Sequence, residues 1–112
     1  MMKRITGIDT KPDHYQADAT AEALEKMPTF RKMFIGAVGG ATAKGQEEAL
    51  DLQQIVLKLR VLNADGDHVD LEEAQLRLLT KKVEENNSQY AAYFLAQMFQ
   101  KIKDAQEPPK AA

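Results

Sequence analysis

The stretch "NADGDHVDLEE", residues 63–73, contains the residue types that could bind a metal ion. Asn63, Asp65, Asp67 and Asp70 alternate with other residues around a glycine, and two glutamates follow. Carboxylate and amide oxygens are the ligands that Ca²⁺ takes from proteins. The alternatives are therefore a calcium site, a weak surface cation site on the three aspartates, or a simple turn between two helices.

Neither of two possible alignments of this stretch with an EF-hand loop meets the requirements of such a loop. Such a loop needs a glycine at its sixth position and a bidentate glutamate at its twelfth. With Asn63 as the first position, these two positions hold His68 and Ala74. With Gly66 as the sixth position, the loop would begin at Val61, which has no side-chain oxygen. We therefore predict a turn with Gly66 in a left-handed conformation, and no metal ligands.

No other set of residues in the sequence predicts catalysis or ligand binding. The chain has no cysteine, one serine (Ser88) and two isolated histidines, His14 and His68. Their number and spacing do not indicate a nucleophilic triad or the usual ligands of a zinc site. The segment "GGATAKG", residues 39–45, lacks the Lys-Ser or Lys-Thr pair of a phosphate-binding loop. We expect a protein that is not an enzyme and has no catalytic residue, cofactor or metal.

The composition is that of one small, folded domain. The chain has 112 residues, of which 44% are hydrophobic and 29% charged, and its formal net charge of −2 gives no basic field for nucleic acid. The basic start "MMKR" is not followed by the apolar segment of a signal peptide. The apolar stretch at residues 33–41 is too short to span a bilayer. We expect a soluble, cytoplasmic protein without membrane contact.

Hydrophobic spacing predicts mainly helical structure in this single domain, residues 1–112. Residues 1–17 form an irregular segment with one short strand near residues 4–9 as an option. Two short helices follow within residues 18–38. The first starts near Asp18 or Thr20, with Thr20 and Glu22 as its N-terminal cap region, and runs to Lys26, whereas Pro28 opens the second. Residues 39–45 are a glycine-rich connector, residues 46–105 a helical body and residues 106–112 a tail.

The first helix of the body has a competing interpretation. A stripe at helical spacing predicts a helix over residues 46–63; its members are Leu52, Ile55, Val56, Leu59 and Leu62. Residues 54–62 also alternate, which is typical of one strand of a hairpin. The helix is favoured because the stripe begins earlier, among good helix formers.

Two more helices complete the body. The first spans residues 70–85, with Asp70 as its N-cap and Glu73 in the position of a capping box. The last begins at a cap on Asn87 or Ser88, and "PP" at residues 108–109 bars its continuation. Together the elements predict a small helical bundle of four to five helices.

The long helix carries more apolar residues than one core contact uses. Its second group falls on another side of the helix, and two tyrosines lie on the polar side of the last helix. An apolar surplus of this kind is left either for a second contact in the same core or for another subunit. The candidate interface residues are Leu50, Leu57, Val61, Tyr90 and Tyr93.

Residues 49–102 resemble a pattern found in small helical bacteriophage and prophage proteins. The resemblance rests on a helix that ends in "KLRVLNADG", the helix start "VDLE" and a final helix with a run of small and apolar residues. It also rests on the short segment "ITGID" at residues 5–9, which precedes this stretch. It implies a phage assembly or accessory factor, or a modulator of a host protein, in the host cytoplasm. It implies no role for any individual residue.

The function expected from the sequence is a non-enzymatic protein-interaction module that self-associates as a homo-oligomer. The alternative is a nucleic-acid-associated regulatory protein. That alternative requires four short basic clusters to converge on one face. The clusters are Lys3–Arg4, Arg31–Lys32, Lys81–Lys82 and Lys101–Lys103.

Overall fold

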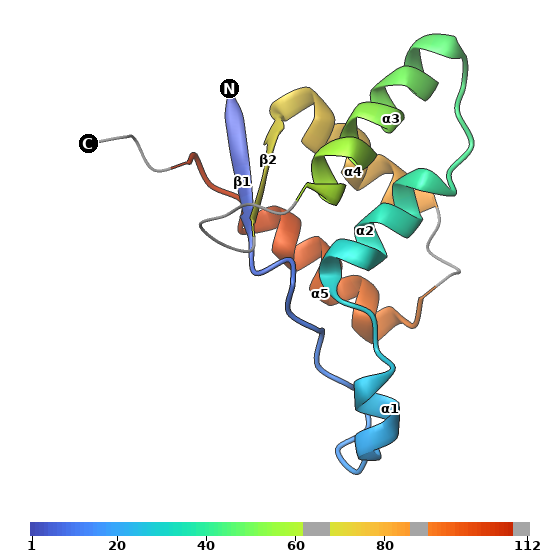
Figure 1. Ribbon diagram of the computed structural model, residues 1–112, viewed down its shortest axis with the longest axis vertical. Helices are drawn as coiled ribbons and strands as arrows, with labels where there is room; N and C mark the ends of the chain where they lie inside the picture. The colour runs from blue at the N-terminus through green and yellow to red at the C-terminus, as the bar shows by residue number, and fades with distance from the viewer. Residues whose placement is uncertain (62–67, 86–89, 109–112) are drawn as a thin grey trace.

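The computed structural model describes residues 1–61, 68–85 and 90–108. Within these ranges the chain forms five helices and one two-stranded sheet (Figure 1). The elements in chain order are β1 (Met2–Thr6), α1 (Ala21–Glu25), α2 (Phe30–Gly39), α3 (Gln46–Arg60), β2 (His68–Glu72), α4 (Glu73–Glu85) and α5 (Ala92–Lys103). The predicted mainly helical chain with an N-terminal strand is confirmed. A second strand, however, makes the fold more than a helical bundle.

The sheet pairs the first residues of the chain with the segment before α4. β1 and β2 are antiparallel, with Ile5 opposite Val69 and Arg4 opposite Asp70. Ile5 and Val69 are buried in the core, whereas the Arg4 guanidinium donates to both carboxylate oxygens of Asp70, at 2.8 and 3.1 Å. Asp70 is therefore a strand residue, and the predicted N-cap and capping box with Glu73 are wrong. The alternation of Val69 and Leu71 was the strand signal, and its pairing partner lies more than sixty residues away.

The C-terminal segment pairs with the second edge of β1 at one position, Arg4. The Arg4 N–H donates to the Gln106 carbonyl at 2.6 Å, and the Gln106 N–H donates to the Arg4 carbonyl at 3.1 Å. Two residues further in this antiparallel register, Pro108 would come level with Met2. Proline has no N–H to donate, so the ladder ends there. Gln106 thus belongs to the folded domain and not to a tail.

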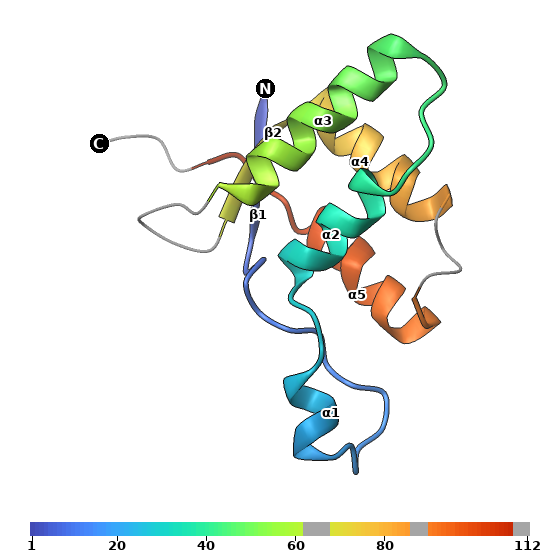
Figure 2. The same ribbon diagram turned by 45° about the vertical axis from the view of Figure 1, so that its right-hand side comes forward.

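Threonine side chains cap the two short helices near the N-terminus. Thr20 accepts a hydrogen bond from the Ala23 N–H at 3.1 Å, and Thr29 accepts one from the Lys32 N–H at 3.3 Å. The first cap is as predicted, but Pro28 lies before the second cap and is not a helical residue. α1 buries no side chain and projects away from the other helices (Figures 1 and 2).

The core draws side chains from every element except α1. α3 contributes three residues of its predicted stripe, which confirms the helix and excludes the hairpin for this segment. The buried apolar residues are Ile5, Ile8, Phe30, Met33, Phe34, Ala37, Val38, Leu52, Ile55, Leu59, Val69, Leu71, Leu79, Val83, Met98 and Ile102. They hold α2, α3 and α4 together beside the sheet.

Two predicted features concern segments outside the described residues. The acidic turn with Asn63, Asp65, Gly66 and Asp67 falls within residues 62–67. The predicted caps Asn87 and Ser88 fall within residues 86–89. α5 itself begins at Ala92 with Ala91 as its N-cap, so the predicted start of the last helix was too early.

Candidate interaction surface

α3 presents a row of large apolar side chains on its outer side. Leu50 is 53% exposed, Leu57 45% and Val61 58%. At about 100° per residue, these three positions lie within roughly 40° of one another around the helix. The buried stripe of Leu52, Ile55 and Leu59 occupies the opposite side. The second apolar group of the long helix is therefore not used by the core of its own chain.

An apolar groove runs beside this row, between α3 and the end of α2. Its volume is about 410 Å³, and its polar side chains are those of Gln53 and Arg60. Its apolar lining includes Val38, Ala41, Ala49, Val56 and Leu57. The row formed by Leu50, Leu57 and Val61, together with this groove, is called the α3 surface below. Leu57 belongs to both parts, so the two form one continuous area.

A buried lysine of α4 holds the beginning of α3. The Lys82 side chain is only 1% exposed and forms ion pairs with Glu48 and, at 3.1 Å, with Glu85. Its Nζ also donates to the Thr42 carbonyl at 2.8 Å. The hydrogen bond between Lys82 and Glu48 raises the pKa of the lysine and lowers the pKa of the carboxylate. Lys82 thus fixes the segment before α3 and the first turn of the helix to α4.

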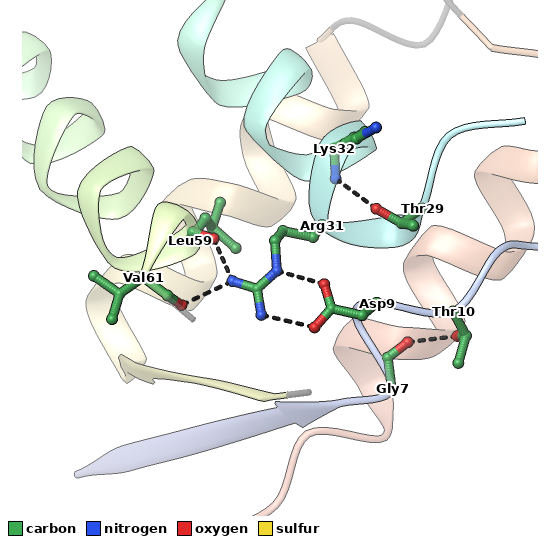
Figure 3. A network of polar contacts seen from close by, with 8 residues as sticks. All are labelled: Gly7, Asp9, Thr10, Thr29, Arg31, Lys32, Leu59 and Val61. Carbon is green, nitrogen blue, oxygen red and sulfur yellow. Dashed lines mark hydrogen bonds and ion pairs between the residues drawn. The ribbon is translucent and has the colours of Figure 1, made fainter. Parts of the chain in front are cut away.

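A buried arginine of α2 holds the end of α3 (Figure 3). The Arg31 guanidinium donates to both oxygens of Asp9, at 2.7 and 3.1 Å. It also donates to the carbonyl oxygens of Leu59 and Val61, the latter at 3.0 Å. These carbonyls lack partners within the helix, and a cation is favourable at a helix C-terminus. The hydrogen bonds from Arg31 hold the pKa of Asp9 below its ordinary value.

The sequence indicates Arg31 and Lys82 only as members of basic clusters, so their structural role was not predicted. The sequence nevertheless contained a sign of burial for both residues. Arg31 lies among the apolar residues of α2, directly after Phe30, and Lys82 lies between Leu79 and Val83 on the buried side of α4. A charged residue within an apolar stripe is buried only when it is paired. Together the two side chains hold both ends of the helix that carries the α3 surface.

The two tyrosines of the predicted interface lie elsewhere. Tyr90 precedes α5, is partly buried against the core and donates to the Met33 carbonyl at 3.4 Å, so it is not on the polar side of the last helix. Burial raises the pKa of its hydroxyl. Tyr93 is exposed on α5 and touches Phe94 edge-on. Because α2 and α4 lie between α3 and α5 in both views (Figures 1 and 2), Tyr93 is not part of the α3 surface.

An aromatic group around Phe94 was not expected from the sequence. His14 stacks on Tyr15 with a centroid distance of 4.6 Å, and both rings lie within 6 Å of the Phe94 centroid, at 5.7 and 5.8 Å. His14 is therefore packed against aromatic rings. This contact joins the N-terminal loop to α5, which local sequence patterns cannot indicate.

Metal binding receives no structural support in the described residues. No group of three or more His, Cys, Asp or Glu side chains gathers there in a way that could hold an ion. Asp70 is occupied by Arg4, whose hydrogen bonds lower the pKa of the carboxylate. The other two aspartates of the weak-site alternative, Asp65 and Asp67, lie outside the described residues. In the same part of the chain, none of the helices has the length and apolar character needed to cross a membrane.

No protein-family model matches the chain, and neither does any curated protein or solved structure. The function proposed below therefore rests on the chemistry and geometry of the α3 surface.

Each of the four basic clusters has one member engaged within the chain. Arg4 binds Asp70, Arg31 binds Asp9 and Lys82 binds Glu48. Lys101 lies over the Phe30 ring at 5.1 Å from its centroid. Side chains engaged in this way have less to offer to phosphates.

Three paired carboxylates predict how stability depends on pH. The pKa values of Asp9, Glu48 and Asp70 lie below their ordinary values of 3.8, 4.5 and 3.8. A lowered pKa in the folded state stabilises the protein above the unfolded-state pKa, and this stabilisation is lost as the pH falls through the folded-state pKa. We expect the free energy of unfolding, measured with urea, to fall progressively below about pH 4.5. Asp9→Asn should weaken this acid dependence; a stability that rises below pH 4.5 would contradict the pairing.

Proposed function

We propose that the protein is a non-enzymatic protein-interaction module that self-associates through the α3 surface. The observation that carries this proposal is the exposed row of Leu50, Leu57 and Val61 beside an apolar groove. Contiguous exposed apolar surface is typical of interaction sites, and burial of the exposed half of one such side chain contributes about 1 kcal/mol. The row lies on a helix whose ends are held by buried cations, so little ordering is needed on binding.

The shape and chemistry of the groove favour a protein partner over a small molecule. Small-molecule sites enclose their ligand and aim several convergent polar groups at it. The groove contains Gln53 and Arg60 as polar side chains, and its apolar row continues outside it on the surface of α3. A helix with an apolar face matches such a groove. An assembly or accessory role, or modulation of another protein, belongs to the same proposal.

Leu57→Glu is expected to abolish self-association. We expect light scattering behind a sizing column to give a dimer or larger species for the unaltered chain, at both low and high salt. A carboxylate at position 57 would have to be buried without a partner, which weakens association by about 3 kcal/mol, or more than 100-fold. The matched control is Leu24→Glu on α1, where the leucine is 42% exposed and lies away from the α3 surface. This control should remain associated.

The two ways in which this experiment can fail have different meanings. A monomer at all concentrations of the unaltered chain would disprove self-association. An oligomer that survives Leu57→Glu would show that the interface lies elsewhere, with exposed Tyr93 on α5 as the next residue to replace. Urea unfolding of both variants checks that the fold is retained.

A further inference from the structure

The two exposed leucines of the α3 row are symmetric about one point of the helix. Leu50 and Leu57 are equally distant from the midpoint between Gln53 and Gln54. At 1.5 Å per residue, each leucine lies about 5 Å from that midpoint along the helix axis. If a second α3 helix ran in the opposite direction about this point, Leu50 of each copy would lie level with Leu57 of the other.

One flank of α3 carries acidic residues before this midpoint and a basic residue after it. Glu47 and Asp51 line a hollow on the α4 side of the helix, and Lys58 reaches Gln75 of α4 on that side with a hydrogen bond of 2.7 Å. At about 100° per residue, the three residues lie within about 40° of one another around the axis of α3. In an antiparallel pair, Lys58 of the second copy would lie between Glu47 and Asp51, about 3 Å from the level of each.

A parallel pair lacks this complementarity. In that arrangement the charged flank of each copy faces the opposite flank of the other, where Lys58 would lie beside Arg60. No basic residue of that opposite flank lies level with Glu47 or Asp51. Like charges brought together cost free energy, whereas opposite charges at the edge of an interface select its register.

We infer that two copies of the chain pair through antiparallel α3 helices, with a two-fold axis level with the midpoint between Gln53 and Gln54. This inference rests on the proposed self-association and adds its geometry. The interface is isologous, because each copy contributes the same leucines and the same charged flank. With helix axes 8–10 Å apart, the two Gln54 Cα atoms come within about 6 Å of each other.

The absence of cysteine from the chain makes a disulfide test direct. Gln54→Cys and Gln46→Cys are matched variants, since both replace an exposed glutamine of α3. Two Gln54→Cys chains should form a disulfide-linked dimer under mild oxidation, because their Cα separation suits a disulfide. Two Gln46→Cys chains should not, because their positions lie about 22 Å apart along the axis. Non-reducing electrophoresis reads the result, and light scattering of the reduced variants reports association.

Each outcome bears on a different claim. Cross-linking of both variants means a parallel pair and overturns the antiparallel geometry, while self-association stands. Cross-linking of neither variant, with a dimer in light scattering, places the two-fold axis elsewhere and also overturns it. A monomer in light scattering overturns the proposed self-association itself. Only efficient cross-linking at position 54 without cross-linking at position 46 supports the inferred pair.

Discussion

Arg31→Met is expected to lower the free energy of unfolding by about 3 kcal/mol. The substitution keeps the apolar part of the side chain but removes every donor to Asp9 and to the carbonyl oxygens of Leu59 and Val61. Breaking a buried ion pair in this way costs about 3–5 kcal/mol. The lower end of this range applies because the Asp9 side chain is 39% exposed, so water can hydrate its carboxylate when the arginine is removed.

The neighbouring residue supplies the matched control for this substitution. Lys32→Met removes the same charge from the same helix, but Lys32 is exposed. The free energy of unfolding of the protein should therefore change by less than about 0.5 kcal/mol. Arg31→Lys should recover only part of the loss, because an ammonium group cannot bind a carboxylate in two places and two carbonyls together. Urea unfolding measures all three variants. Equal stabilities for Arg31→Met and Lys32→Met would show that the end of α3 does not depend on the arginine.

Arg31→Met should also reduce self-association, although Arg31 lies outside the α3 surface. Val61 follows the last helical residue, Arg60, and its carbonyl is held by the guanidinium. Without that contact the end of α3 opens more often, and a less ordered surface binds more weakly. Hydrogen exchange of the Val61 N–H, which donates to Lys58, should be faster in the variant.

Lys82→Met is expected to lower the melting temperature by about 10 °C. The lysine is the group that joins α4 to Glu48 and to the Thr42 carbonyl. Its removal leaves these acceptors without their donor at a site where the side chain is almost fully buried. The segment between α2 and α3 should then be cleaved faster by a protease, which limited proteolysis can follow.

Lys81→Met is the control for Lys82→Met. Lys81 adjoins Lys82, but its pKa is lowered because its ammonium group lies beside that of Lys44. Removing one of two neighbouring like charges relieves repulsion, so the melting temperature should stay the same or rise slightly. Scanning calorimetry compares the two variants. If both lower the melting temperature equally, the effect comes from the loss of charge on α4 and not from the contacts of Lys82.

Helices with local signals could be predicted from the sequence. Thr20 marked the beginning of α1 because a threonine side chain caps a helix from within four residues. The stripe of α3 indicated which side is buried, because its period is a property of the helix alone. The same period places Leu50 and Leu57 on a different side of α3 from the core group.

Features that depend on distant partners could not be predicted in this way. The segment from His68 to Glu72 precedes good helix formers and contains a capping pattern, yet pairing with β1 makes it a strand. The exposure of Leu57 depended on which elements pack around α3, and the burial of Tyr90 on its contact with α2. Tertiary contacts decide such cases over local propensity.

The pairing of β1 also determines the order in which the chain can fold during its synthesis. β1 is made before the other described elements, but β2 follows more than sixty residues later and Gln106 about a hundred residues later. Closing such long loops is entropically costly and slow compared with forming α2 or α3. Until then the apolar side chains of Ile5 and Ile8 have no complete core to enter. β1 is thus synthesised long before the segments that hold it in its native position.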